Sequence, residues 1–302
     1  MFNLSVDSDW HANYTSANLQ ATLKQNYSQI DDRICLGDVL LYRATETNEN
    51  EFEYWQDELL VLGNHDMIAA ASGWNWYDQP TNVEAYNRWY APYVATNGID
   101  IAENTLYWSK EYTDKNILLI GGYCMFNNSE DRELQYEFFR ERLFYAIQHN
   151  LSVIIAYHWC FQDMQTIHCS FTNASALNTM NGHDSTMPET YGYEERLTQL
   201  VDDAKRAGLD FICWINGHRH TDEILIKDGQ LHLLVGSTKY DSGNRVKRID
   251  GTPAEALLNV VTYNERKQIE IRRYGADVKT YGGLRHLLIL EKDGTVVFDW
   301  SA

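Results

Sequence analysis

The sequence predicts an α/β fold, because short apolar runs alternate along it with segments of helical spacing. Most of the apolar runs are bounded by Gly, Asn or Asp, which is typical of strands. Hydrophobic residues make up 44% of the 302 residues, enough for a substantial buried core. The chain has four prolines and no Ser- or Gly-rich spacer. We therefore expect a single domain over residues 1–302.

Each element follows from this periodicity. Strands are expected at residues 2–6, 33–36, 58–62, 116–121, 152–157, 211–215 and 230–235. Helices are expected at 15–28, 130–149 and 193–208, the last of which ends at Gly208. Alternating segments at 257–264, 268–274, 285–291 and 295–300 predict an antiparallel meander or the second sheet of a sandwich.

The charge and the hydropathy pattern argue against several partners. The 43 acidic side chains outnumber the 25 basic ones and give a net charge of −18. No block of Lys or Arg offers the basic face that duplex nucleic acid or an anionic membrane requires. The longest apolar stretches, 117–126 and 151–161, fall short of the roughly 18 residues that span a bilayer. Because residues 1–7 lack the features of a secretory signal, we expect a cytoplasmic protein.

The cysteines point to the same compartment. There are five of them, an odd number, and none forms a closely spaced pair. This spacing argues against a disulfide framework and against a CxxC zinc site. We therefore expect reduced thiols.

Residues able to bind a metal directly follow five of the expected strands. They are Asp9-Trp10-His11, Gly37-Asp38, Gly63-Asn64-His65-Asp66, His158 and Asn216-Gly217-His218-Arg219-His220. Each cluster alone is a weak signal, since Gly-Asp is a common turn and a lone His is usually structural. Together they place carboxylate, amide and imidazole ligands at the edge of a sheet, where the sites of α/β proteins form. This mixture suits zinc, iron or manganese better than calcium or copper(I).

In this order the clusters resemble the motifs of the calcineurin-like metallophosphoesterase superfamily, namely D-x-H, G-D-x-x-D/N, G-N-H-D/E, a lone H and G-H-x-H. The stretches 90–93, 106–109 and 134–143 also resemble that family. The resemblance covers about residues 1–245, and residues 246–302 are expected to be the β-rich C-terminal part of the same domain. It implies a four-layer α/β/β/α sandwich with two mixed β-sheets and a metal site at the C-terminal ends of the strands.

The resemblance also implies a ligand set for two divalent ions, with manganese, iron or zinc expected. Asp9, His11 and His220 would hold the first ion, and Asn64, His158 and His218 the second. Asp38 would bridge them, because two cations about 4 Å apart need an anion between them.

The chemistry expected from this set is phosphoric-ester hydrolysis. A water that the two ions convert to a bridging hydroxide would attack phosphorus. His65 would protonate the leaving alkoxide, and Asp66 would orient its imidazole. The alternative for Asp66 is that it caps the turn or helix that follows.

Several positions depart from the family pattern or leave two interpretations open. Leu41 stands where the family has Asp or Asn, which puts metal selectivity and rate in doubt. Cys160, near the expected centre, is either a buried thiol or a site of oxidation or metal inhibition. His168 and His183 are either surface residues or substrate contacts.

Two longer stretches also have two interpretations. The aromatic-rich residues 73–93 are either a packed excursion over the core or an interface. Residues 162–192 form either a plain surface loop or a functional one.

The function expected from the sequence is therefore a metal-dependent hydrolase of a small phosphomonoester or phosphodiester. The alternatives are a nuclease or polynucleotide phosphodiesterase on the same site, and a non-catalytic interaction module of the same fold. The acidic charge disfavours duplex nucleic acid, and the basic segments 245–248 and 272–273 come late in the chain. Nothing in the sequence indicates the oligomeric state.

Overall fold

The structure is a computed structural model. It describes residues 1–9, 29–39, 58–67, 80–126, 128–161, 164–169, 192–220, 222–236, 246–247, 257–275, 277–278 and 287–299. The expected helix at 15–28 and most of residues 162–192 lie outside these ranges.

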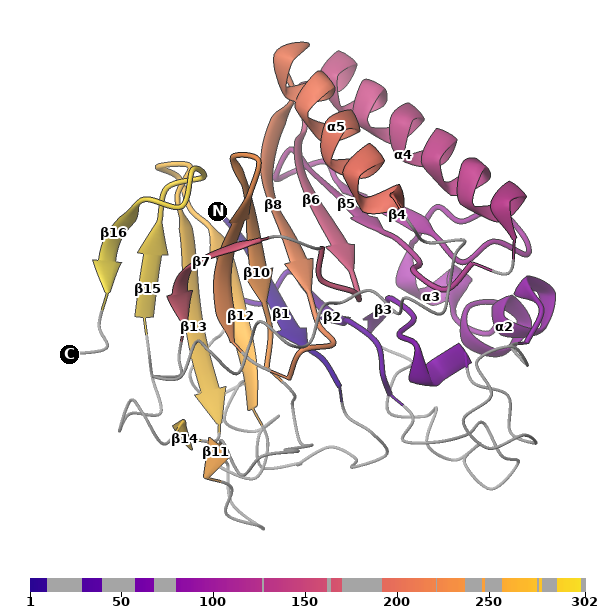
Figure 1. Ribbon diagram of the computed structural model, residues 1–302, viewed down its shortest axis with the longest axis horizontal. Helices are drawn as coiled ribbons and strands as arrows, with labels where there is room; N and C mark the ends of the chain where they lie inside the picture. Colours follow the sequence, from indigo (N-terminus) through magenta and orange to yellow (C-terminus); the bar gives the residue numbers. More distant parts are fainter. Residues whose placement is uncertain are drawn as a thin grey trace.

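Two seven-stranded sheets form the body of the molecule (Figure 1). Sheet 1 has the order β16 (Val296–Asp299), β15 (Leu287–Leu290), β13 (Ile269–Gly275), β12 (Leu257–Tyr263), β1 (Phe2–Asp7), β2 (Asp32–Cys35) and β3 (Leu59–Leu60). Sheet 2 has the order β4 (Trp108–Tyr112), β5 (Ile117–Gly121), β6 (Ser152–Tyr157), β8 (Asp210–Asn216), β10 (Gln230–Leu234), β9 (Glu223–Lys227) and β7 (Gln165–Cys169). A separate pair joins β11 (Val246–Lys247) to β14 (Asp277–Val278).

Both sheets are mixed, with a run of parallel strands at one edge of sheet 1 and in the middle of sheet 2. In sheet 1, β1, β2 and β3 run parallel, while β12 pairs antiparallel with β1. In sheet 2, β5, β6, β8 and β10 run parallel, with β4 and β9 antiparallel. The carboxyl ends of neighbouring parallel strands therefore lie along the same edge of each sheet, and the loops that follow these strands lie next to one another.

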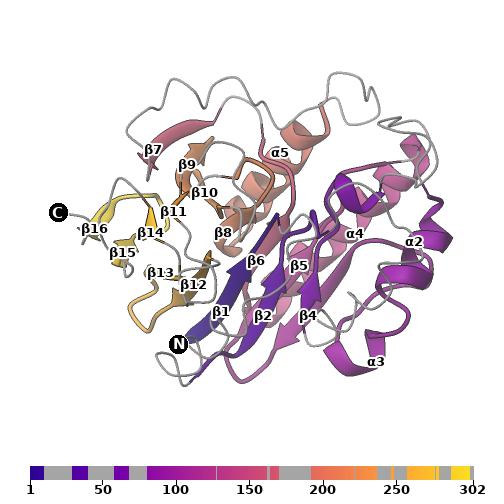
Figure 2. The same ribbon diagram turned by 90° about the horizontal axis from the view of Figure 1, so that it is seen from below.

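Helices cover the outer face of sheet 2. Figures 1 and 2 show α4 (Ser129–His149) and α5 (Tyr193–Arg206) side by side along this face. Asn128 caps α4 by accepting a hydrogen bond from the backbone N–H of Asp131, and Asn150 ends it with a left-handed φ of 55°. The guanidinium of Arg196 on α5 pairs with the carboxylate of Glu133 on α4.

Two short helices lie beside β3 and β4, where part of the aromatic stretch is described. They are α2 (Asn82–Trp89), which starts with a Thr81–Glu84 capping box, and α3 (Val94–Asn97). Trp89 and Tyr90 are buried, so this part of the stretch packs on the core. Among the described residues, no helix has the length and apolar character needed to cross a membrane.

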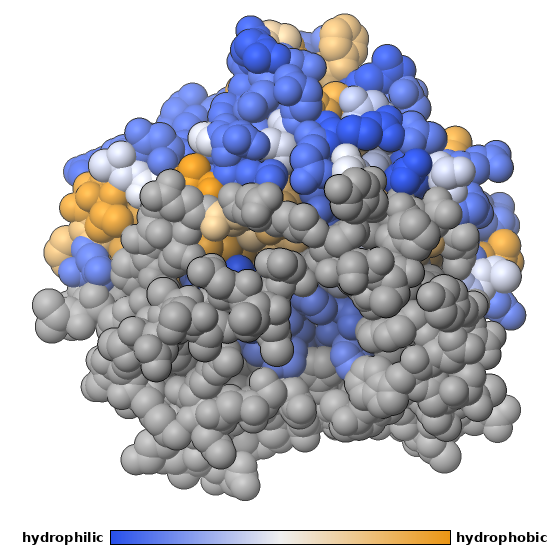
Figure 3. Space-filling model, viewed as in Figure 1, coloured by the Kyte–Doolittle hydropathy of each residue, from blue (hydrophilic) through white to orange (hydrophobic). Residues whose placement is uncertain are grey.

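The outer edge of sheet 1 is hydrophobic. Val296, Val297 and Phe298 of β16 are 44%, 49% and 47% exposed. Figure 3 shows hydrophobic side chains at the left of the molecule, where β15 and β16 lie in Figure 1, against an otherwise mainly hydrophilic described surface.

The expected strands and helices within the described ranges are confirmed, with small shifts at their ends. The exception in length is β3, which spans Leu59–Leu60 instead of the expected 58–62. The four C-terminal segments form the meander β12–β13–β15–β16, and this meander joins sheet 1 through the pairing of β12 with β1. The expectation of two mixed β-sheets with flanking helices is likewise confirmed.

Candidate metal centre

Five loops carry the expected ligands, and both sheets contribute to them. Asp9, Asp38 and Asn64 follow β1, β2 and β3 of sheet 1. His158 follows β6, and residues 218–220 follow β8, both of sheet 2. The strand pattern alone predicts loops at the edge of one sheet; the structure differs because β12 joins β1–β3 into a sheet of their own.

The backbone is left-handed at four of the expected ligands. Asp9, Asp38, His218 and His220 have φ values of 53°, 52°, 71° and 54°. Side chains other than glycine rarely adopt this conformation, and it costs about 1–3 kcal/mol per residue when it persists. The sharp bends turn these side chains out of the strand direction.

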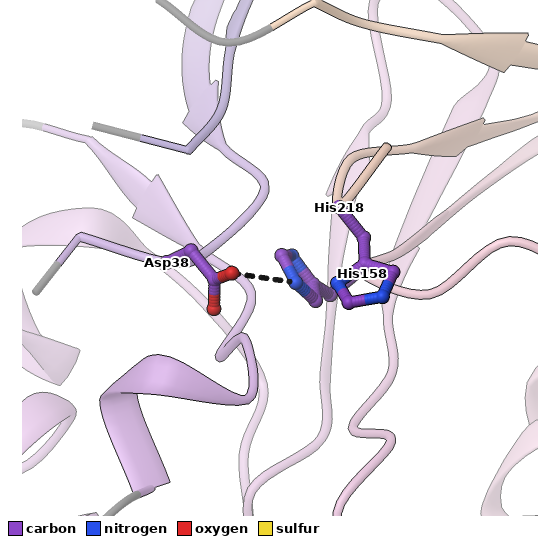
Figure 4. Close-up of side chains that lie close together, drawn as sticks. All are labelled: Asp38, His158 and His218. Atoms are coloured by element: carbon purple, nitrogen blue, oxygen red, sulfur yellow. Dashed lines mark ion pairs between the residues drawn. The ribbon is translucent and has the colours of Figure 1, made fainter. Parts of the chain in front are cut away.

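Asp38, His158 and His218 come from three loops and lie close together (Figure 4). His158 also contacts Asn64. Its Nε2 lies 3.1 Å from Oδ1 of Asn64 and 3.3 Å from Oδ2 of Asp38. His218 lies beside it, with the two imidazole rings 5.2 Å apart between centroids. One ligand atom each from Asp38, His158 and His218 lies within 4.8 Å of the others. This spacing leaves room for one cation between them.

The hydrogen bonding of His158 fixes which nitrogen faces the centre. Its Nδ1 lies 2.5 Å from the carbonyl oxygen of Leu36, so Nδ1 carries a proton and donates it. Nε2 then faces the two oxygens of Asn64 and Asp38. Burial disfavours the charged ring, but the carboxylates of Asp38 and Asp9 outweigh burial and raise the pKa of His158 to about 9. Nε2 therefore sits where a positive charge, a proton or a metal ion, is stabilised.

Asp9 and His220 form a second group of donors. Nε2 of His220 lies 3.3 Å from Oδ1 of Asp9, and Oδ2 of Asp9 accepts hydrogen bonds from the Ser8 hydroxyl at 2.6 Å and the His218 backbone N–H at 2.9 Å. Burial opposes ionisation of Asp9, but His220 outweighs it and lowers the pKa of Asp9 to about 2. Asp9 is thus an anion at neutral pH, as a carboxyl group must be when it binds a metal ion.

His218 is a neutral imidazole in this surrounding. Burial and the positive charge of His158 lower the pKa of His218 to about 3. A neutral ring offers a lone pair to a cation. Nitrogen and oxygen donors at these separations therefore fit a borderline divalent metal ion.

Two glycines are needed because the loops approach one another closely. A Cβ on Gly63 would lie 2.2 Å from Oδ1 of Asp38, and a Cβ on Gly217 would lie 2.1 Å from Oγ of Ser8. No side chain fits at either position without displacing a residue of the centre.

Asp66 ties the loops after β2 and β3 together. Its carboxylate accepts hydrogen bonds from the backbone N–H groups of Asp38, Val39 and Gly63, each at 2.9 Å. His65 lies beside this junction, with its backbone N–H donating to Oδ1 of Asp38 at 2.8 Å and its Nε2 3.9 Å from Oδ2 of Asp38. Two of these N–H groups belong to the loop after β2, so Asp66 does more than cap its own turn.

The structure brings together Asp9, Asp38, Asn64, His158, His218 and His220, which are six of the seven expected ligands. His11, the seventh, lies outside the described residues, as do Leu41 and His183. The side chain of His168, on β7, is also outside them. Cys160 is a buried thiol, 1% exposed, and burial raises its pKa well above the usual value.

Two residues of the centre were missed by the sequence reasoning. Ser8 supports Asp9, and the indole N–H of Trp159 donates to Oδ1 of Asn64 at 3.2 Å. Their only signal in the sequence is that each is next to an expected ligand. The arrangement can bind cations and, through them, an anionic oxygen ligand.

Comparison with solved structures finds this fold in a purple acid phosphatase from seeds of yellow lupin (Lupinus luteus). The TM-score is 0.52 at 12% sequence identity, and the match covers 91% of this chain and 51% of that one. The chain has the calcineurin-like metallophosphoesterase fold.

Two further structures resemble the chain. A dimetal phosphatase from Danio rerio has a TM-score of 0.49 and 12% identity, with 93% of this chain and 99% of that one covered. A candidate 5'-nucleotidase from Staphylococcus aureus has a TM-score of 0.47 and 15% identity, with 92% of this chain and 54% of that one covered. No family model and no curated protein sequence matches the chain.

Proposed function

We propose that the chain is a metal-dependent hydrolase of small phosphoric esters with two divalent ions. The observation that carries this proposal is the convergence of buried oxygen and nitrogen donors from five loops on a fold that metallophosphoesterases share. Asp9, His11 and His220 would hold one ion, and Asn64, His158 and His218 would hold the other. Asp38 would supply the anion that both ions share. Manganese, iron and zinc all suit this donor set.

When bound, the ions neutralise the charge of the phosphoryl oxygens and lower the pKa of a bound water. The chain supplies the rest of the chemistry. His65 is 15% exposed and lies at the centre beside Asp38, so its imidazole can reach the leaving oxygen of a bound ester and protonate it. Asp66 holds the loop that carries His65, and we keep the interpretation that it also orients the His65 ring.

The substrate is a small phosphomonoester or phosphodiester. In the basic segment 272–273, Arg273 is buried and pairs with Asp222, so it presents no charge to a nucleic acid. With a net charge of −18, a long polyanion would meet repulsion outside the centre. We place this activity in the cytoplasm.

Hydrolysis of a chromogenic phosphate monoester and its matching diester tests the proposal. We expect activity that a chelator removes and that manganese, zinc or iron restores, and we expect Asp38→Asn to abolish it. His65→Ala should lower kcat by about 10²–10⁴-fold for a poor leaving group, which needs a proton, and far less for an activated one.

Two results would contradict this assignment. A protein that stays inactive on both esters with every metal is not this hydrolase. If His65→Ala keeps full activity on the ester with the poor leaving group, His65 is not the general acid.

A further inference from the structure

We propose that Trp159 is a positioning residue that fixes the side-chain amide of Asn64 with its oxygen toward the metal. This inference rests on the proposed function, since it concerns a ligand of the second ion. It assigns a role to the residue that directly follows His158.

The contact that carries the proposal is a hydrogen bond between two buried side chains. The Nε1–H of Trp159, which is 2% exposed, donates to Oδ1 of Asn64 at 3.2 Å, and Asn64 is 3% exposed. An indole N–H is a donor only, whereas an amide has an oxygen at one end and an N–H₂ donor at the other. A rotated amide would place donor against donor, so the indole selects the oxygen end.

The oxygen that Trp159 selects is the one at the centre. Oδ1 of Asn64 lies 3.1 Å from Nε2 of His158. The indole also packs on His218, with the ring centroids 6.0 Å apart. Trp159 therefore contacts Asn64 and His218 and directly follows His158 in the sequence. These three residues are the proposed terminal ligands of the second ion.

Trp159 is itself held in place by sheet 2. The side-chain N–H₂ group of Asn216, at the end of β8, donates to the carbonyl oxygens of Trp159 at 2.7 Å and of Tyr157 at 3.0 Å. Asn216 is fully buried. These bonds join the end of β8 to the backbone at and just before Trp159, so they hold the backbone that carries the indole, as a group that orients a metal ligand needs.

The test is the affinity of the full-length protein for Mn²⁺ or Zn²⁺, measured by competition with a chromophoric chelator. We expect Trp159→Phe to weaken binding of one ion by about 10–100-fold, the range found when a partner of a metal ligand is removed. Trp214→Phe is the matched control, because Trp214 is also buried and its Nε1–H donates to the amide oxygen of Gln230 at 2.7 Å, away from the centre. It should leave the affinity unchanged.

A second pair of variants separates orientation from packing. In the Asn64→Asp background both side-chain oxygens are acceptors, so there is no amide end to select. Trp159→Phe should then weaken metal binding by less than about 3-fold in that background, against the larger loss in the parent. If Trp159→Phe does not fold, 3-benzothienylalanine at position 159 keeps the shape of the indole and lacks the N–H.

The outcomes are distinct. A loss that disappears in the Asn64→Asp background supports the positioning role. An unchanged affinity of Trp159→Phe, or an equal loss in both backgrounds, overturns it while the proposed function stands. A parent protein that binds neither ion overturns the proposed function and this role with it.

Discussion

At the scale of residues, the centre combines backbone strain with side chains that hold it. Four proposed ligands are left-handed, and the bonds that Asp66 and Asp9 accept from backbone N–H groups fix two of the strained loops. Strain of this kind persists only where the surroundings over-determine the conformation. Removing a bond that holds a loop should therefore affect stability as well as metal binding.

Asp66→Asn tests this directly. An amide has one acceptor oxygen, and its N–H₂ end would face backbone donors, so at least one of the N–H groups of Asp38, Val39 and Gly63 loses its acceptor. We expect the free energy of unfolding, measured with urea in the presence of a chelator, to fall by about 1–3 kcal/mol. Asp293→Asn is the control, since Asp293 accepts a bond from the Thr295 N–H in an exposed turn. Equal, small losses in both variants would show that Asp66 does not hold the loops.

The positions of the described proposed ligands could be predicted from the sequence because each follows a strand that its hydrophobic pattern reveals. The contacts between them could not. Trp159 bonds to a residue 95 positions earlier, and His218 to one 209 positions earlier. Such pairs depend on how two sheets face each other, which no local pattern encodes.

At the scale of elements, the loop after β3 is held from sheet 2. Strand β3 lies at the edge of sheet 1 and has only two residues. The carbonyl oxygen of Leu60 accepts a bond from Nε1 of Trp108 on β4 at 2.7 Å and one from the hydroxyl of Tyr90 at 3.1 Å. The Trp108 bond connects the two sheets, and the Tyr90 bond connects β3 to the end of α2, both at Leu60, four residues before Asn64.

The elements with a clear apolar pattern were predictable for a physical reason, and strands that carry charged residues were not. Helix α5 and strands such as β6 bury a continuous apolar pattern. In contrast, β4 and β9 carry charged residues within their spans, and their place in the sheet is set by pairing with β5 and β10. Tertiary pairing overrides the local pattern at such strands.

The first turn of α5 predicts a pH dependence of stability. Burial, with a smaller contribution from Glu195, raises the pKa of Glu194 to about 8, while Lys227 acts against this shift. The folded state therefore holds a proton that the unfolded state releases near pH 4.5. The contribution of Glu194 to stability is full below pH 4.5 and is lost as the pH rises through 8.

Glu194→Gln, which stays neutral, should gain stability relative to the parent between pH 5 and pH 8, by up to about 1.4 kcal/mol per pH unit. The gain should level off above pH 8. Urea unfolding at five pH values from 5 to 9 measures it. Glu130→Gln, an exposed position in the first turn of α4, is the control and should give a flat difference. A flat difference for Glu194→Gln as well would mean that Glu194 is ionised in the folded protein.

At the scale of the whole molecule, a strongly negative chain surrounds a centre built to hold cations. The net charge is −18, yet two divalent ions would outweigh the carboxylates of Asp9 and Asp38 locally. The field outside the centre repels long polyanions and is screened by salt within about 10 Å at 0.1 M. The size of the substrate should therefore decide how the rate responds to salt.

We expect kcat/KM for a single-stranded oligonucleotide to rise with ionic strength from 10 to 200 mM, because screening removes the repulsion. For a small chromogenic diester it should change little. The same metal-loaded preparation serves for both measurements, so each substrate is the control for the other. Oligonucleotide hydrolysis that is fast at low salt and falls as salt is added would instead indicate a basic groove and a nuclease.

The pairing of β1 has a consequence for the order in which the molecule is made. Asp9 directly follows β1, which lies between β2 and β12, with Phe2 opposite Tyr263. During synthesis β12 leaves the ribosome long after β1, and the pairing of two strands so far apart in the sequence is slow. The strand that leads to Asp9 therefore has both of its sheet neighbours only after residue 263 has been added.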